Sequence, residues 1–186
     1  HRVDRRQRQM CIRDSHDDLG DVDPERVQDL HRNYFPRTIA KLVADGHLDE
    51  RLGRDFDLET LAAALDPTRD DLIGFMGVRT MINRYLLRTP DKQALEVPQY
   101  FWMRVAMGLS LTEDDPTSSA LALYDSMSNL RHLAAGSTLV NAGTPSAQLS
   151  NCFVMRTEDN LEHIAQTIRD VTVSYTHLTL PTIYSV

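Results

Sequence analysis

The sequence has no long hydrophobic run and no excess of positive charge. No stretch approaches the roughly 20 apolar residues that a membrane-spanning helix needs, and no signal-peptide pattern is present. Lys and Arg total 20 against 27 Asp and Glu, a formal net charge of −7. Because negative charge repels phosphates, binding to nucleic acid or to a membrane is not expected.

The two ends of the chain are related through their possible coding sequences. Residues Val173 to Val186 can be written with codons whose reverse complement, read in the same frame, encodes Asp14 back to His1. Folding imposes no such relation, whereas one DNA adapter ligated to both ends of an insert produces it. We therefore expect residues 1–15 and 172–186 to be adapter-derived. The alternative is a basic N-terminal arm.

Without these flanks the composition is more acidic and poorer in cysteine. The flanks contain five of the 20 basic and two of the 27 acidic residues, so 15 and 25 remain and the net charge is −10. Cys11 lies in the N-terminal flank, which leaves Cys152. A single thiol cannot form an internal disulfide, so a reducing, cytoplasmic environment is expected. The roughly 156 remaining residues can bury one core.

The first helix is predicted from its proline and glycine residues. Pro24 follows an aspartate and is expected to begin a helix. This helix should break near Pro36, resume over residues 38–45 and stop at Gly46.

Aspartates mark the next two helix starts. Asp57 is expected to cap a helix over residues 58–65. Asp70 or Asp71 should open a helix that includes residues 75–87, whose apolar side chains recur at helical spacing.

The most hydrophobic segment, residues 97–111, has proline at its first helical position and one charged residue, Arg104. A helix that is apolar nearly all round is expected to be buried on most faces. Arg104 then needs a carboxylate or carbonyl partner, because an unpaired buried cation is too costly. Residues 114–118 should cap a further helix over residues 119–130.

The pattern changes after residue 135. Residues 137–141 and 150–155 are short runs typical of strands, separated by the turn residues 142–145. Asp159 begins an Asp-x-x-Glu capping pattern and should open a helix over residues 160–171. The sequence thus predicts a helical block followed by strand, turn, strand and helix.

Four stretches resemble consecutive motifs of the ribonucleotide reductase large subunit, in the family's order and spacing. They are Pro98–Leu111 (PQYFWMRVAMGLSL), Leu123–Leu133 (LYDSMSNLRHL), Ser137–Val154 (STLVNAGTPSAQLSNCFV) and Glu158–Val171 (EDNLEHIAQTIRDV). Phe75–Leu87 (FMGVRTMINRYLL) is a weaker match. The form PQYFWMR favours the oxygen-dependent class I.

The resemblance implies a mainly α fold that is a fragment of a larger enzyme. Residues 16–135 are expected to form the family's helical N-terminal domain, and residues 136–171 the first strands of a ten-stranded α/β barrel that is truncated. The family's ATP-binding cone would lie upstream. The radical-bearing cysteine and the second reducing cysteine would lie downstream, so the fragment is expected to be inactive.

Cys152 is identified through this resemblance as a redox-active thiol. In the family a thiyl radical takes the 3′-hydrogen of the substrate ribose, the 2′-hydroxyl leaves as water, and a thiol pair becomes a disulfide. Cys152 matches one member of that pair, on the first barrel strand, and its partner is missing from this chain. From spacing alone, a small buried hydrophobic residue is the alternative.

The resemblance also implies nucleotide contacts. Thr138, Asn151 and Cys152 fall where the family contacts the substrate, although Thr138 could equally be an ordinary strand residue. Asp159, Asn160 and Leu161 fall where it binds the deoxynucleotide effector. Asp159 is also a predicted helix cap, and both roles can coexist.

No metal or other cofactor is expected in this chain, because its histidines lack short metal-ligand spacing. The resemblance implies a ribonucleoside diphosphate substrate, deoxynucleotide and ATP effectors, and a metal-containing small subunit that supplies the radical. It also implies a homodimer of large subunits and thioredoxin or glutaredoxin as reductant.

Two alternatives remain. A cobalamin-dependent (class II) ribonucleotide reductase would share the cysteine and effector positions. A non-enzymatic helical interaction domain would account for residues 24–130, but not for the Cys152 and Asp159 patterns.

Overall fold

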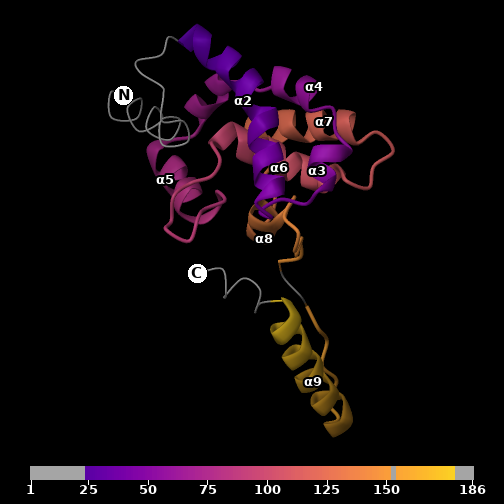
Figure 1. The fold of residues 1–186 in the computed structure, drawn as a ribbon. Coiled ribbons are helices and arrows are strands. Elements are labelled where there is room, and N and C mark those ends of the chain that lie inside the picture. Colours follow the sequence, from indigo (N-terminus) through magenta and orange to yellow (C-terminus); the bar gives the residue numbers. More distant parts are fainter. Residues whose placement is uncertain (1–23, 152–153, 179–186) are drawn as a thin grey trace. The chain divides into compact units, whose positions relative to one another are not determined.

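The computed structural model describes residues 24–151 and 154–178, and the chain divides into two units, the first ending at Leu149 and the second beginning at Ser150. The first unit is helical and the second contains one long helix (Figure 1). Within the described residues, the only β-pairing is a single antiparallel bridge between Arg88 and Ala94. The predicted helical fold is therefore confirmed for this part of the chain.

The first unit is built around α6 (Pro98–Ser110). Every residue from Pro98 to Met107 is buried, as predicted for a helix that is apolar nearly all round. The helix α7 (Pro116–Ser128) packs along α6, which is also contacted by α8 (Gly136–Asn141) and by the 3₁₀ helix η1 (Pro67–Leu72). The other helices of this unit are α2 (Pro24–Ala44), α3 (Arg51–Arg54), α4 (Leu58–Ala63) and α5 (Phe75–Arg84).

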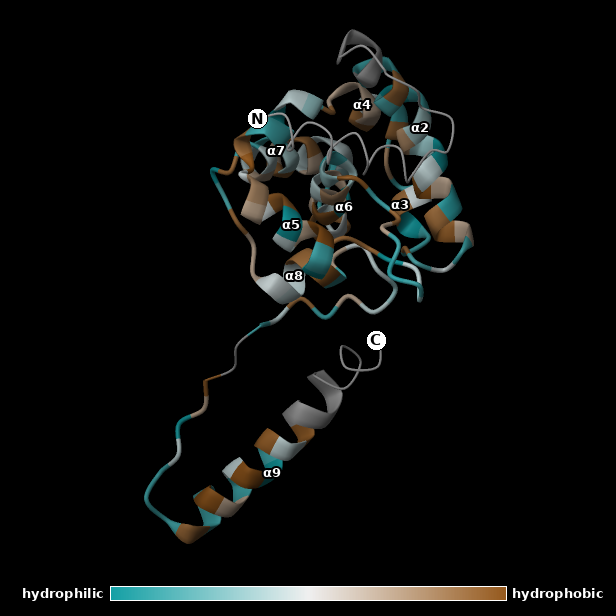
Figure 2. Cartoon of the chain, turned by 90° about the vertical axis from the view of Figure 1, so that its left-hand side faces the viewer, coloured by the Kyte–Doolittle hydropathy of each residue, from teal (hydrophilic) through white to brown (hydrophobic). Residues whose placement is uncertain are grey.

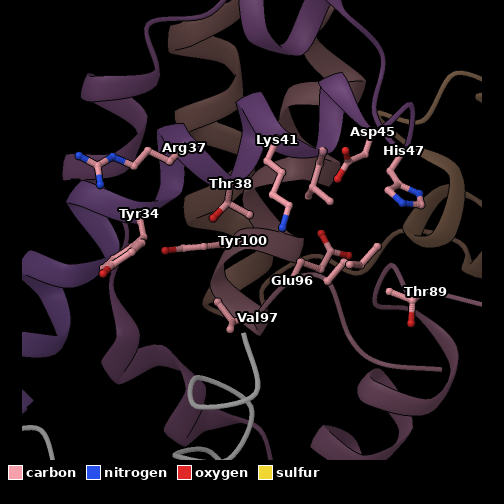
Figure 3. A pocket seen from close by; sticks show the side chains of 12 residues that line it. Tyr34, Arg37, Thr38, Lys41, Asp45, His47, Thr89, Glu96, Val97 and Tyr100 are labelled. Carbon is pink, nitrogen blue, oxygen red and sulfur yellow. The ribbon is translucent and has the colours of Figure 1, made fainter. Parts of the chain in front are cut away.

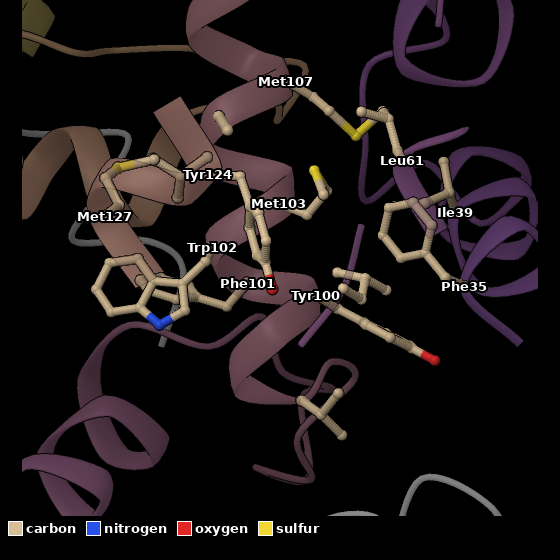
Figure 4. Close-up of a cluster of buried hydrophobic side chains, with 14 of the residues drawn as sticks. Phe35, Ile39, Leu61, Tyr100, Phe101, Trp102, Met103, Met107, Tyr124 and Met127 are labelled. Carbon is tan, nitrogen blue, oxygen red and sulfur yellow. The ribbon is translucent and has the colours of Figure 1, made fainter. Parts of the chain in front are cut away.

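Aromatic and methionine side chains fill the core around α6 (Figure 4). Phe35 of α2 meets Tyr100 edge to face, with ring centroids 5.2 Å apart. Such pairs stabilise a core beyond the apolar area that they bury. The labelled core residues in Figure 4 are Phe35, Ile39, Leu61, Tyr100, Phe101, Trp102, Met103, Met107, Tyr124 and Met127.

The helix α2 begins at Pro24, as predicted, but the predicted break at Pro36 is wrong. A proline inside a helix removes one backbone hydrogen bond. On either side of it, Phe35 and Ile39 are almost completely buried, so their packing holds the helix continuous. The helix ends where predicted, because Gly46 has a φ of +76° and its N–H donates to the carbonyl of Val43.

The predicted caps have mixed outcomes. Asp57 accepts hydrogen bonds from two backbone N–H groups of α4, and Asp115 accepts one from Ser118, so both caps are confirmed. The helix α7, however, begins at Pro116 rather than at residue 119 as predicted. The prediction that Asp70 or Asp71 opens the next helix is wrong. Asp66 caps η1 instead, and Gly74 precedes α5 without a side-chain cap.

The prediction of a strand over residues 137–141 is also wrong, because these residues belong to α8. Alternating β-branched residues favoured a strand. The helix is stabilised instead by Arg104, which binds backbone carbonyls at the C-terminal end of this segment. The turn at residues 142–145 is present, with Gly143 at φ +78°. In the second predicted strand, residues 150, 151, 154 and 155 are not in a strand, and Cys152 and Phe153 lie outside the described residues.

The second unit contains α9 (Leu161–Leu178). Asn160 caps it, because its Oδ1 accepts the N–H of His163 at 2.8 Å; the predicted cap, Asp159, is one residue too early. The helix continues across the predicted adapter boundary between residues 171 and 172, which stays a prediction. Of the helices in the described ranges, none combines the length and apolarity needed to cross a membrane.

Replacing Gly108 by alanine is expected to destabilise the first unit by about 1–3 kcal/mol. A Cβ on Gly108 would lie 2.2 Å from the backbone N of Gly143 and 2.6 Å from the carbonyl carbon of Ala142. Backbone atoms cannot move aside as a side chain can, so α6 and this turn would separate. The shift would be measured by urea unfolding.

Gly53→Ala is the matched control. A Cβ on Gly53 would meet a Val43 methyl at 3.8 Å, which is ordinary van der Waals contact, and alanine favours helix. Equal stability losses for the two variants would contradict the close approach of α6 and the turn.

Candidate functional site

The helix α8 holds the chain just before Cys152. The hydroxyls of Ser137 and Thr138 both donate to the carbonyl of Leu149, at 3.1 and 2.9 Å. The side-chain amide of Asn141 donates to the carbonyl of Gln148 at 2.8 Å. We call Ser137, Thr138 and Asn141 the α8 clamp.

A buried ion pair lies beneath α8. Arg104 is completely buried and Glu96 is 2 % exposed. The Nε of Arg104 lies 2.9 Å from Glu96 Oε2, and its Nη2 lies 3.0 Å from Oε1. Glu96 Oε1 also accepts the backbone N–H of Leu87 at 2.9 Å. The fork geometry makes this pair a strong, charge-assisted interaction. The carboxylate partner predicted for Arg104 is thus Glu96.

The same guanidinium binds the C-terminal end of α8. It donates to the carbonyls of Ala142 at 2.6 Å, Leu139 at 3.2 Å and Val140 at 3.4 Å. The last carbonyls of a helix lack partners within the helix, and positive charge is favourable there. Arg104 therefore serves as the C-terminal cap of α8 and fixes it on α6.

The turn after α8 is held from two sides. The carbonyl of Gly143 accepts the backbone N–H of Asp49 at 2.9 Å. A Cβ at Gly143 would lie 2.9 Å from Leu52 and 3.1 Å from Arg104, so glycine is needed both for space and for its positive φ. The turn is thus enclosed between the α3 region and α6.

Another buried polar network joins η1 to α6 and α7. The hydroxyl of Tyr124 donates to Gln99 Oε1 and accepts the N–H of Asp66. Burial raises the pKa of Tyr124 to about 12. Burial, together with the neighbouring phenol of Tyr34, also raises the pKa of Tyr100 above its usual range. Both phenols therefore stay protonated near neutral pH and act as structural groups.

A pocket of about 450 Å³ lies between α2 and residues 89–100 (Figure 3). Lys41 lies in the last turn of α2, where the helix dipole favours cations. Glu96 already pairs with Arg104. Lys41 and Glu96 thus each have a structural explanation. Its lining residues are Tyr34, Arg37, Thr38, Lys41, Leu42, Asp45, His47, Thr89, Leu95, Glu96, Val97 and Tyr100.

The predicted site residues are divided between the two units. Thr138 is half-buried in α8 of the first unit, whereas Asn151 is exposed in the second. Cys152 lies outside the described residues. Asp159, Asn160 and Leu161 are consecutive exposed residues at the start of α9. The structure brings the last three together, and it gives the Thr138 hydroxyl a protein partner, Leu149.

Sequence reasoning missed Glu96, Ser137 and Asn141. Glu96 carries a detectable signal, because it is an acidic residue immediately before the most apolar helix. Ser137 and Asn141 share one face with Thr138 only if the segment is helical, so the strand prediction concealed them. In the described ranges, no group of three or more His, Cys, Asp or Glu side chains could hold a metal ion.

Comparison with known proteins shows which family this helical unit resembles. Residues 71–147 match the family model of the ribonucleotide reductase all-alpha domain. The chain is 41% identical over 147 residues to the ribonucleoside-diphosphate reductase subunit alpha of Chlamydia trachomatis, covering 78% of this chain and 14% of that protein. It is 36% identical over 140 residues to the Helicobacter pylori subunit alpha, covering 75% of this chain and 17% of that protein.

A eukaryotic relative matches to the same extent. The chain is 36% identical over 146 residues to the Schizosaccharomyces pombe large chain of the same enzyme, covering 77% of this chain and 17% of that protein. The chain thus spans between about one seventh and one sixth of the length of these three relatives. It belongs to the ribonucleotide reductase large-subunit family, whose all-alpha N-terminal region it contains.

Proposed function

We propose that the full-length protein reduces ribonucleoside diphosphates to deoxyribonucleoside diphosphates, and that this chain is part of its catalytic subunit. The observation that carries the proposal is the 35–41% identity to proteins named for that reaction, over three quarters of the chain. In this proposal residues 136–171 lead into the family's α/β barrel, and residues 1–15 and 172–186 are adapter-derived.

Cys152 is proposed to supply reducing electrons. A radical elsewhere in the enzyme takes the 3′-hydrogen of the ribose and returns it at the end of the reaction. The C2′–O bond breaks and the oxygen leaves as water. Cys152 and a second thiol provide two electrons and two protons, and become a disulfide. Each deoxynucleotide formed therefore leaves one disulfide in the enzyme. Thioredoxin or glutaredoxin in a reducing cytoplasm would reduce this disulfide again.

The start of α9 is proposed to take part in binding the deoxynucleotide effector. Asp159 and Asn160 are exposed, and they lie at a helix N-terminus, where backbone N–H groups favour polar and anionic ligands. A metal-containing small subunit is proposed to supply the radical, as in class I. A cobalamin requirement of the full-length enzyme would instead place it in class II.

The helix α9 is proposed to join two large subunits. Leu161, Ile164, Ile168 and Val171 recur at helical spacing, and they are between 39% and 84% exposed. Figure 2 shows hydrophobic residues alternating with hydrophilic ones along this helix. An apolar stripe with this spacing is suited to packing against another helix.

Replacing Ile168 by glutamate in the full-length protein is expected to shift the dimer to monomer, because a charge would be placed on the stripe. Light scattering after size exclusion measures the mass. Arg169→Glu introduces the same residue at the adjacent exposed position, off the stripe, and should leave the dimer intact. A dimeric Ile168→Glu protein would show that α9 is not the contact.

The reaction is tested with the full-length protein, a candidate small subunit, a ribonucleoside diphosphate and dithiothreitol. Deoxynucleotide should form, and the 186-residue chain alone should form none. Without dithiothreitol, the full-length enzyme should lose two thiols per deoxynucleotide made. If no deoxynucleotide forms with the small subunit or with adenosylcobalamin, the enzymatic proposal fails and a non-enzymatic helical domain becomes the better account.

A further inference from the structure

We propose that the pocket between α2 and residues 89–100 binds a small molecule that carries an oxyanion, a phosphate or a carboxylate, on an apolar ring. Arg37, Lys41 and Tyr100 line this pocket, and in this proposal they bind the oxyanion. All three residues belong to the first unit. The inference goes beyond the proposed function and does not depend on it.

The hydroxyl of Tyr100 has no hydrogen-bond partner among the described residues. Tyr100 is 3% exposed, and its ring meets those of Phe35 and His31 edge to face, with the centroids 5.2 Å apart in both pairs. The hydroxyl points into the pocket (Figure 3), and burial raises its pKa above the usual range, so it keeps its proton. Buried polar groups are nearly always hydrogen-bonded. Besides packing in the core, Tyr100 therefore presents a donor to an acceptor in the pocket.

Two cations lie beside this donor, on one face of α2. Arg37 and Lys41 are exposed and lie four residues apart, which is about 6 Å along the helix axis. Other arginines of the first unit, such as Arg51 and Arg69, pair with aspartates. In the described ranges, neither Arg37 nor Lys41 has a carboxylate at ion-pair distance. The helix dipole accounts for Lys41 in the last turn, but Arg37 lies well before the end of α2 at Ala44, so its charge is available to a ligand.

The two carboxylates that line the pocket do not cancel these cations. Both oxygens of Glu96 are bound by Arg104, which neutralises its charge. Asp45 follows Arg37 by eight residues, about 12 Å along the helix axis. Figure 3 shows Asp45 at one end of the pocket, and the guanidinium of Arg37 and the hydroxyl of Tyr100 toward the other. The Arg37 end of the pocket therefore favours an anion, although the chain as a whole is acidic.

The rest of the pocket indicates what carries the oxyanion. Leu42, Leu95 and Val97 give it an apolar wall, and its volume of about 450 Å³ is in the range of small-molecule sites. Such sites combine apolar surface with a few polar groups that fix the orientation of the ligand. An inorganic ion would leave the apolar wall in contact with water, whereas a ring would cover it. We therefore expect an oxyanion on an apolar ring to bind more tightly than the ion alone.

The test titrates the 186-residue chain with phenyl phosphate and with benzoate, which share a ring and differ in the oxyanion. Binding is measured by isothermal titration calorimetry at about 0.15 M salt, where distant exposed charges are largely screened. The tighter of the two should bind at one site, at least about tenfold more tightly than benzamidine, which has a cation on the same ring. Its ring-free counterpart, inorganic phosphate or acetate, should bind at least about tenfold more weakly. In NMR spectra, the shifted amides should cluster in residues 34–47 and 89–100.

Two variants test the residues that carry the proposal. Tyr100→Phe removes only the hydroxyl and Arg37→Gln removes one cation, and each should weaken binding of the tighter ligand at least about tenfold, as for a lost hydrogen bond to a charged group. Arg32→Gln is the matched control and should bind like the wild type. Arg32 is an exposed arginine of the same helix, but it lies near Asp29 and does not line the pocket. Thermal unfolding checks that each variant is folded.

Several results would each overturn the proposal. Neither ring compound binds saturably to the wild-type chain, or benzamidine or the ring-free ion binds as tightly as they do. Tyr100→Phe or Arg37→Gln keeps the wild-type affinity, or Arg32→Gln loses as much affinity as Arg37→Gln, which would indicate attraction to net charge alone. None of these results bears on the proposed reaction, because the titration needs neither the full-length enzyme nor turnover. An inactive full-length enzyme would, in turn, leave the pocket proposal standing.

Discussion

Replacing Arg104 by methionine is expected to lower the free energy of unfolding by about 3–5 kcal/mol, because it leaves a buried carboxylate without its partner. Arg104 is 0% exposed, and the side chain of Glu96 is 1% exposed. Three carbonyls of α8 and its turn would lose their donor as well. The change would be measured as the shift in the urea midpoint of the 186-residue chain, followed by circular dichroism.

Two further variants separate the contributions. Adding Glu96→Leu to Arg104→Met removes the unpaired charge and should recover part of the loss. The remainder is the cost of the uncapped α8 carbonyls and of the Leu87 N–H, which loses its acceptor. Arg131→Met breaks an exposed ion pair with Asp125, in which Arg131 is 69% exposed, and the midpoint should move little. A similar midpoint for Arg104→Met and Arg131→Met would contradict the network.

Replacing Cys152 by serine in the full-length enzyme is expected to lower the multiple-turnover rate of deoxynucleotide formation by at least about a thousandfold. Removing an essential chemical group has effects on this scale. Serine keeps the size but cannot form a disulfide. If Cys152 supplies reducing electrons as proposed, the thiol pair that would reduce the 2′-carbon is then incomplete. Deoxynucleotide formation would be measured with dithiothreitol and with thioredoxin.

Ser150→Ala is the control for this experiment. Ser150 is an exposed residue of the same segment and carries no redox chemistry, so its variant should keep wild-type turnover. A Cys152→Ser enzyme that turns over normally would show that the electrons come from other thiols.

Local rules predicted the helices whose signals lie within their own residues. The proline start and apolar composition of residues 97–111 gave α6 almost to the residue, and the aspartate caps gave α4 and α7. The need of Arg104 for a partner also followed from composition alone. Its partner, Glu96, is eight residues away, and it becomes identifiable once the helix start at Pro98 is known.

The local sequence rules failed where tertiary contacts determine the secondary structure. Residues 137–141 have a strand-like composition, yet Arg104, more than 30 residues earlier, binds their carbonyls and selects a helix. Pro36 stays inside α2 because the flanking Phe35 and Ile39 are buried against other elements. Neither contact is visible in a local window of sequence.

The candidate site was predictable in part. The resemblance to a family pointed to Thr138, but the partner of its hydroxyl, Leu149, depends on how α8 folds back onto the following segment. Ser137 and Asn141 bind the same segment, through the carbonyls of Leu149 and Gln148. The Asp159 prediction missed the helix cap by one residue, because aspartate and asparagine are equally good caps and stand side by side here.

The dependence of α8 on Arg104 has a consequence for the order of folding. Six residues are too few for a helix to persist in water by itself, where even favourable sequences need about 12–15. Glu96 and Arg104 can pair early in folding, because they are near neighbours in sequence. The helix α8 can form only after the guanidinium of Arg104 is in place. Its amide hydrogens should therefore gain protection from solvent exchange after those of α6.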